Sequence, residues 1–145
     1  MNTLALSTPD QSGIGWDLLI DQSGNLVVAT GGTALAQDVA SAVRTFRGEA
    51  WYDITLGVPY YENIFGQRIS LQYLKQAFIA AGMIVPNVAQ IKVFFIGPTS
   101  SRTIGGQLQI FSADGLVAVV LTGNLFGVAP WWVSGASEEA VGATT

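Results

Sequence analysis

The spacing of the apolar residues changes near Pro86 from the period of a helix to the period of a strand, and this order constrains the fold most. Ahead of Pro86 lie two apolar stripes at helical spacing, which comprise Leu35, Val39, Ala42, Val43 and Phe46, then Leu71, Leu74, Phe78 and Ala81. After it come three strand-like runs, residues 90–96, 107–111 and 116–122. Elements segregated in this way are typical of an α+β layer rather than of alternating βαβ units. The sequence therefore predicts a single α+β domain with a mainly antiparallel sheet and two helices packed on one face.

Turn and capping residues set the expected limits of these elements. We expect Thr33 to cap the first helix and Gly48 to follow its end, whereas Ser70 and Gly82 bound the second helix. Asp114 and Gly115 predict the tight turn of a hairpin, so the last strands should form a C-terminal three-strand segment. The strand at 90–96 carries apolar residues on both faces, which predicts that both faces are covered.

The ends of the chain are expected to differ from its centre. Residues 1–15 predict an extended N-terminal arm with little structure of its own, and residues 16–20 and 26–30 predict a hairpin that follows it. The α+β domain is expected over residues 16–123, with residues 51–66 as a structured loop. Residues 124–145 then form an apolar and finally flexible C-terminal tail.

Composition excludes most enzyme classes. The chain has no cysteine and no histidine, which removes thiolate nucleophiles, thiolate or imidazole metal sites and serine-histidine triads. The acidic residues are dispersed and form no calcium-binding loop, and the adjacent Gly31 and Gly32 lack the spacing of a phosphate-binding motif. We therefore predict no catalytic, cofactor-binding or metal-binding residues and no enzymatic activity.

The balance of charged and apolar residues indicates association with other proteins. Half of the residues are hydrophobic and only 11% are charged, so either an unusually large share of the chain is core or other subunits cover apolar surface, and we favour the second interpretation. The net charge is −4 and the six cations form no cluster, so no nucleic-acid partner is expected. No apolar run is long enough for a membrane span and no leader is recognisable, so we expect the protein in the cytoplasm until it assembles.

Two candidate sites have both a functional and a structural interpretation. Glu49 and Asp53 could divide acid and base roles in glycoside hydrolysis, but a helix end followed by a local Arg47–Glu49 pair accounts for them more simply. Phe126, Trp131 and Trp132 could anchor a partner, because tryptophan is enriched among interface hot spots, or they could fold back on the domain.

A short signature resembles that of a known family. Thr45, Gly48 and Glu49 form a Thr-x-x-Gly-Glu pattern around Arg47, and Gly57 follows it. In this pattern the chain resembles the baseplate wedge and sheath-initiator family of contractile phage tails, the baseplate assembly protein W-like proteins. The resemblance extends from about Asp21 through Leu121 and includes Gln37 near the helix start. Pro86 and Val88 match a later family motif whose flanking charges are absent here, so no salt bridge is expected there.

This resemblance implies a structural role in a virion. Its members sit in the tail baseplate as about six copies around the tube, bound to wedge proteins and to the tail sheath protein, and possibly to the tail tube. They initiate the sheath by pairing the edge of a strand with an extended segment of a sheath subunit. The strand after Gly115 and the N-terminal hairpin are the candidate edges. The alternatives are a small peptidoglycan hydrolase of the tail, which would use Glu49 and Asp53, and another tail completion or tube-end protein.

Overall fold

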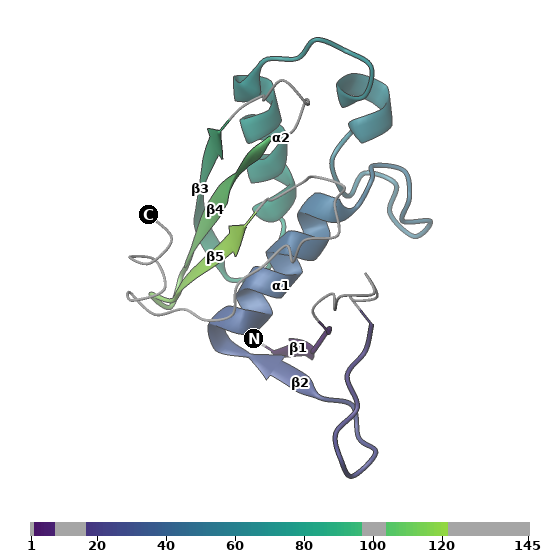
Figure 1. Ribbon diagram of the computed structural model, residues 1–145, viewed down its shortest axis with the longest axis vertical. Coiled ribbons are helices and arrows are strands. Elements are labelled where there is room, and N and C mark those ends of the chain that lie inside the picture. Colours follow the sequence, from purple (N-terminus) through teal and green to yellow (C-terminus); the bar gives the residue numbers. More distant parts are fainter. Residues whose placement is uncertain (1, 8–16, 97–103, 122–145) are drawn as a thin grey trace.

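In the computed structural model the chain is described over residues 2–7, 17–96 and 104–121 (Figure 1). Two short strands, β1 (Asn2–Leu4) and β2 (Val28–Thr30), precede the helix α1 (Gly31–Arg44). A short π-helix, η1 (Tyr60–Ile64), separates α1 from the helix α2 (Leu71–Gly82). Three strands follow, β3 (Val88–Ile96), β4 (Gly105–Ser112) and β5 (Val117–Leu121). The predicted α+β class is confirmed.

The last three strands form an antiparallel sheet in the order β3-β4-β5, and both long helices cover the same face of it (Figure 1). In this part of the molecule, which we call the body, α2 contacts β3 and α1 contacts β5. The register pairs Ile91 with Ile110 and Leu108 with Val120, which places alternate apolar side chains against the helices. They form one core with Leu35, Val39, Val43, Leu74 and Phe78.

Local signals placed α2 and the β4–β5 hairpin correctly. The Ser70 hydroxyl accepts a hydrogen bond from the backbone N–H of Tyr73 at 3.1 Å and caps α2 as predicted. The turn after β4 is closed by hydrogen bonds from Gly115 N to Ser112 O and from Leu116 N to the Ser112 hydroxyl. Gly115 has φ +85°, a conformation that glycine adopts without strain, so the Asp-Gly signal marked the turn.

Three expectations about the elements were wrong. The first helix begins at Gly31 with Thr30 as its N-cap, not at Thr33, because Gly31 turns the chain directly out of β2 with φ +60°. Among the described elements, both helices cover the strand at 90–96 on the face of Ile91 and Val93, while Lys92, Phe94 and Ile96 on the other face are exposed. The π-helix was not predicted, because its aromatic residues have neither a helical nor a strand period.

The N-terminal lobe, which we define as residues 2–7 and 17–30, lies at the N-terminal end of α1 (Figure 1). β1 pairs antiparallel with β2, and beyond it Leu6 bridges Leu18. The predicted hairpin is present as an Ile20–Leu26 bridge, with Val27 N donating to Leu19 O. Within the expected N-terminal arm, β1 and the bridge of Leu6 are therefore extended and paired with the rest of the lobe.

Candidate functional site

The family signature lies in a loop that joins α1 to η1, and we call residues 45–58 the motif loop. Thr45 ends the helix, since both its N–H and its hydroxyl donate to Ser41 O, at 3.0 and 2.8 Å. The two ends of the loop are then paired side by side: Val58 N donates to Thr45 O and Arg47 N donates to Val58 O, each at 2.9 Å. The chain therefore leaves α1 at Thr45, and Val58 at the other end of the loop comes back to lie beside it.

Gly57 permits this close return. Its φ is +93°, and a Cβ at this position would clash with the Thr45 carbonyl oxygen and lie 2.8 Å from its carbon. A backbone atom cannot move aside as the end of a side chain can, so only glycine fits. The spacing between Thr45 and Gly57 in the signature thus has a direct steric cause.

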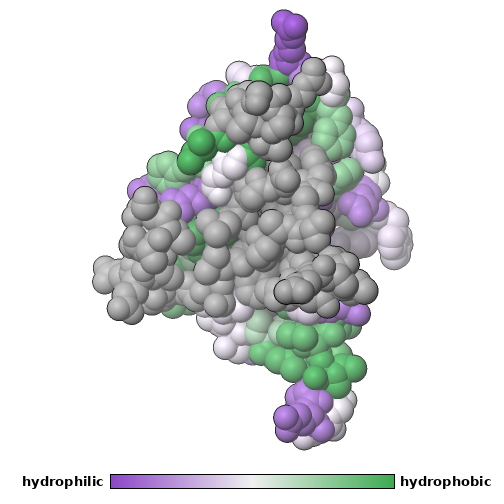
Figure 2. Space-filling view, viewed as in Figure 1, coloured by the Kyte–Doolittle hydropathy of each residue, from purple (hydrophilic) through white to green (hydrophobic). Residues whose placement is uncertain are grey.

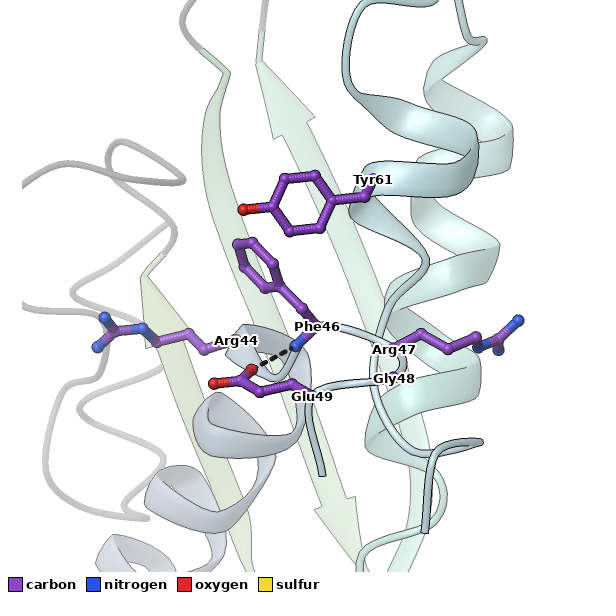
Figure 3. A pocket seen from close by; sticks show the side chains of 6 residues that line it. All are labelled: Arg44, Phe46, Arg47, Gly48, Glu49 and Tyr61. Carbon is purple, nitrogen blue, oxygen red and sulfur yellow. Dashed lines mark hydrogen bonds between the residues drawn. The ribbon is translucent and has the colours of Figure 1, made fainter. Parts of the chain in front are cut away.

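Gly48 and Glu49 form a tight turn rather than the end of the helix. The helix already ends at Arg44, and Glu49 N donates to Phe46 O across a turn in which Gly48 has φ +90°. The Glu49 carboxylate accepts a hydrogen bond from Phe46 N at 3.0 Å (Figure 3). The predicted Arg47–Glu49 pair is wrong, since the Arg47 guanidinium points away from Glu49 and the carboxylate is directed to the backbone.

Aromatic rings hold the motif loop against the body. The Phe46 ring lies 4.8 Å from the ring of Tyr60 and 5.1 Å from that of Tyr61, centroid to centroid. Tyr60 is buried and donates its hydroxyl to Val43 O at 2.7 Å, which satisfies a carbonyl near the end of α1. Burial raises the pKa of this phenol well above its ordinary value, so it remains a donor at neutral pH.

A surface hollow of about 650 Å³ lies between this cluster and the turn (Figure 3). It is lined by Arg44, Phe46, Arg47, Gly48, Glu49 and Tyr61. Its polar groups could contact a polar or charged segment of a partner. They do not assemble a nucleophile with an adjacent base, which acyl transfer would need.

The geometry of Glu49 and Asp53 does not favour glycoside hydrolysis. Asp53 is exposed, and its carboxylate accepts hydrogen bonds from the hydroxyl and the N–H of Thr55, which hold its pKa below the ordinary value. A general acid at neutral pH needs the opposite shift. Glu49 is used in the turn described above. Across residues 2–7, 17–96 and 104–121, no three acidic side chains are grouped as metal ligands would be.

Pro86 lies in a turn between α2 and β3, and Val88, the first residue of β3, closes it. Val88 N donates to Val85 O, and Asn87 has φ +71°, which is the geometry of a type II turn with proline in its second position. The Asn87 amide donates to the Asp114 carboxylate at 2.8 Å, so this turn is tied to the β4–β5 hairpin. Without the family's flanking charges, the motif is held by backbone geometry and by this neutral donor.

Large apolar side chains are also exposed elsewhere on the body, among them those of the motif loop and of β3. Trp51, Tyr52 and Ile54 project from the motif loop, and the Trp51 side chain is 88% exposed. Phe94 and Ile96 are exposed at the end of β3, Ile96 at 76%. Sequence reasoning did not single out β3, since it expected cover on both faces. The predicted anchors Phe126, Trp131 and Trp132 lie outside the described residues.

A comparison with known families identifies the family of this chain. The family model of the contractile injection system sheath initiator matches residues 14–104, well over half of the chain. The chain belongs to the sheath initiator family. The match begins ahead of Asp21 and ends before β4, so the predicted span of the resemblance was too long at its C-terminal end. A comparison with curated proteins gives no match.

Family membership gives this sheath initiator a structural role in a contractile injection system. The matched region contains the N-terminal hairpin, α1, the whole motif loop, α2 and β3. The residues that the signature identified are therefore brought together in one loop, and Pro86 and Val88 lie on a separate turn. Within the described residues, no helix has the length and apolarity that a membrane span needs.

Proposed function

We propose that this sheath initiator is a component of a contractile phage tail baseplate, which joins wedge subunits and starts the sheath by strand-edge pairing. Its partners are the other wedge proteins and the tail sheath protein, possibly with the tail tube, in about six copies per particle. It would be made in the host cytoplasm and act in the virion. The family supports the structural role, and the strand edge and the partners are our own proposal.

The observation that carries the proposal is the position of β3. It is an outer strand of the body sheet and the longest strand described, with nine residues, and the helices leave one of its faces uncovered. On that face Lys92 is followed by the exposed Phe94 and Ile96. A long outer strand with apolar side chains pairs readily with another extended chain, because backbone hydrogen bonds supply affinity and alternate side chains set the register.

The edges favoured by sequence reasoning fit this role less well. β5 is also an outer strand, but Ala118, Val119 and Val120 are all buried, so it offers little exposed side-chain surface. In the N-terminal lobe Ala5 N donates to Val27 O, Val27 N donates to Leu19 O, and Leu19 N donates to Ala5 O. These backbone groups satisfy one another in a closed ring, so none of them is left for an additional strand.

The motif loop suits the second part of the proposal, which is attachment to the wedge. Gly57, Thr45 and the Gly48 turn hold the loop rigidly, and Trp51, Tyr52 and Ile54 extend from it into solvent. Exposed aromatic residues on a rigid support lose little conformational entropy on binding and are frequent hot spots. A wedge protein with an apolar pocket would match them.

The experiment is to introduce a lysine on the exposed face of β3. Phe94→Lys and Ile96→Lys should leave the protein folded and abolish sheath growth on purified baseplates, because charge on an outer strand opposes apolar pairing. Val117→Lys on β5 and Ile54→Lys on the motif loop are the controls, and Ile54→Lys should instead reduce incorporation into the wedge. Electron microscopy of the particles gives the readout. Normal sheaths on the β3 variants, with loss only in Val117→Lys, would move the site to β5.

The enzymatic alternative has its own test. Glu49→Gln retains an acceptor for Phe46 N, so assembly should be close to normal, and neither this variant nor the parent should degrade peptidoglycan. A cell-wall-degrading activity that disappears in Glu49→Gln would instead establish the hydrolase. The position of the subunit in an image of the particle separates a baseplate protein from a tail completion or tube-end protein.

A further inference from the structure

The side chain of Gln37 on α1 is hydrogen-bonded to the N-terminal segment, and both of its partners there are main-chain atoms. Its side chain is 2% exposed, and both ends of its amide are hydrogen-bonded. Nε2 donates to Leu4 O at 2.7 Å, and Oε1 accepts from Leu6 N at 2.9 Å. A carbonyl and an N–H two residues apart on one edge of an extended chain are the groups that a neighbouring strand would contact. Gln37 therefore takes the place of a strand along that edge.

The other edge of the same segment is held by backbone as well. Asn2, Thr3 and Leu4 pair with Thr30, Ala29 and Val28 in β2. Ala5 then donates to Val27 O at 2.9 Å and accepts from Leu19 N at 3.2 Å. Residues 2–6 thus occupy a slot between Gln37 on α1 and residues 19 and 27–30 of the lobe. We call it the strand slot.

The strand slot holds an extended occupant mainly by its main chain, with one side-chain hydrogen bond, between Asp38 and Thr3. Residues 2–6 supply the partners of both polar atoms of Gln37, and folded proteins avoid leaving such atoms unpaired. The other hydrogen bonds described above all go to the main chain of residues 2–6. The same segment of any other copy of this chain would make the same bonds, so exchange between copies sacrifices none of them.

The surface around the strand slot indicates which occupant it takes in an assembly. Large aliphatic side chains on both the segment and the lobe are exposed around it, with Ile20 at 67%: Leu4, Leu18, Ile20, Leu26 and Val28. Apolar surface gathers at the lower end of the molecule in Figure 2, where Figure 1 places the lobe. Apolar residues gathered on so small a lobe mark a surface that associates. A second copy brings an equal apolar surface together with the matching strand.

From these two observations we propose that the N-terminal strand is exchanged between copies of this sheath initiator. Residues 2–6 of one copy fill the strand slot of another, and the aliphatic rims of the two lobes cover each other. Gln37 binds the main chain of an extended segment, and the exposed aliphatic side chains around the slot bind those of a second lobe. The proposal concerns contacts between identical chains and is independent of the strand edge at β3.

Disulfide trapping between two single-cysteine variants tests the exchange. The chain has no cysteine, so only introduced thiols can react. Leu4 and Val28 are directly opposite in the register of β1 and β2, and both are half-exposed, so either can be replaced without emptying the core. Full-length Leu4→Cys and Val28→Cys proteins are purified, mixed at increasing concentration and oxidised. A Leu4–Val28 disulfide can then form only between two different copies.

We expect a covalent heterodimer whose yield rises with concentration and exceeds, by about tenfold, that of a Leu4→Cys and Leu26→Cys mixture with the wrong register. Mass spectrometry of the cross-linked peptide confirms the pairing. In the Leu4→Cys/Val28→Cys double variant, formation of a disulfide shows that β1 is docked beside β2. An intrachain disulfide in that variant, with no heterodimer above the control at the highest concentration, would overturn the proposal. Sheath growth is not measured, so failure here leaves the proposed function untouched.

Discussion

The body and the N-terminal lobe hold their strands in place by different means. In the body, the side chains of α1, α2 and three strands form one buried core. In the lobe, Ala29 is the buried hydrophobic residue among those described, and the segments are joined by backbone hydrogen bonds and by Gln37. Burial is additive and non-directional, whereas each hydrogen bond contributes little net free energy but fixes geometry. The body therefore supplies most of the stability, whereas the lobe has a defined arrangement that opens at little cost in free energy.

The largest expected effect is the loss of a core ring from the body. Phe78 is fully buried and contacts the rings of Tyr60 and Phe95, with centroids 6.5 and 5.4 Å away. Phe78→Ala should lower the free energy of unfolding by about 3–5 kcal/mol, measured by urea denaturation. Tyr73→Ala, on the same helix but substantially exposed, should cost about 1 kcal/mol or less. Equal costs for the two would mean that α2 is not packed as described.

A smaller loss is expected when the motif loop is strained. Gly57→Ala and Gly48→Ala introduce the same methyl group at φ +93° and +90°, but only the Gly57 position clashes with backbone. Gly48→Ala should cost about 1 kcal/mol from its conformation alone, and Gly57→Ala clearly more, about 2–3 kcal/mol. Thermal or chemical unfolding of the pair isolates the clash. Similar costs would show that Thr45 and Gly57 do not approach closely.

The lobe should respond locally rather than globally. Gln37→Leu leaves Leu4 O and Leu6 N without their partner and should destabilise the docked strand by about 1–3 kcal/mol. Amide hydrogen exchange should quicken at residues 2–7 while the amides of β4 keep their protection. Gln76→Leu, on the exposed side of α2, is the control. If β4 loses protection to the same extent, the lobe and the body unfold together and the comparison fails.

The smallest effect concerns pH at the junction of the two regions. Burial raises the pKa of Asp38 above its ordinary value, and a hydrogen bond with Thr3 of β1 opposes this only in part. The folded state then binds the proton more tightly than the unfolded state, so the favourable contribution is present at low pH and is lost as pH rises through the folded pKa. Stability should fall over that range in the parent, relative to Asp38→Asn. Parallel curves for the two proteins would contradict the shift.

Local patterns predicted those parts of the fold that local energetics decide. Ser70 and the Asp114-Gly115 turn carry their own capping or turn geometry, so the start of α2 and the β4–β5 hairpin were placed correctly, whereas Gly82 is the last residue of α2 and Met83 is its C-cap. The signature around Thr45, Gly48 and Glu49 identified the family, but Gly48 was assigned to a helix end because an isolated glycine marks either a cap or a turn. The Arg47–Glu49 pair was wrong for a related reason, since a backbone donor was closer than the guanidinium.

The sequence alone determined the α+β class, the two amphipathic helices and the absence of thiol and imidazole chemistry, because these follow from residue identity and from spacing along the chain. Tertiary structure alone decided which face of β3 is exposed, that residues 2–6 dock against Gln37, and that Thr45 touches Gly57. Each of these depends on two segments that are distant in sequence meeting in space. No local periodicity records such a meeting, since only packing of the whole domain selects it.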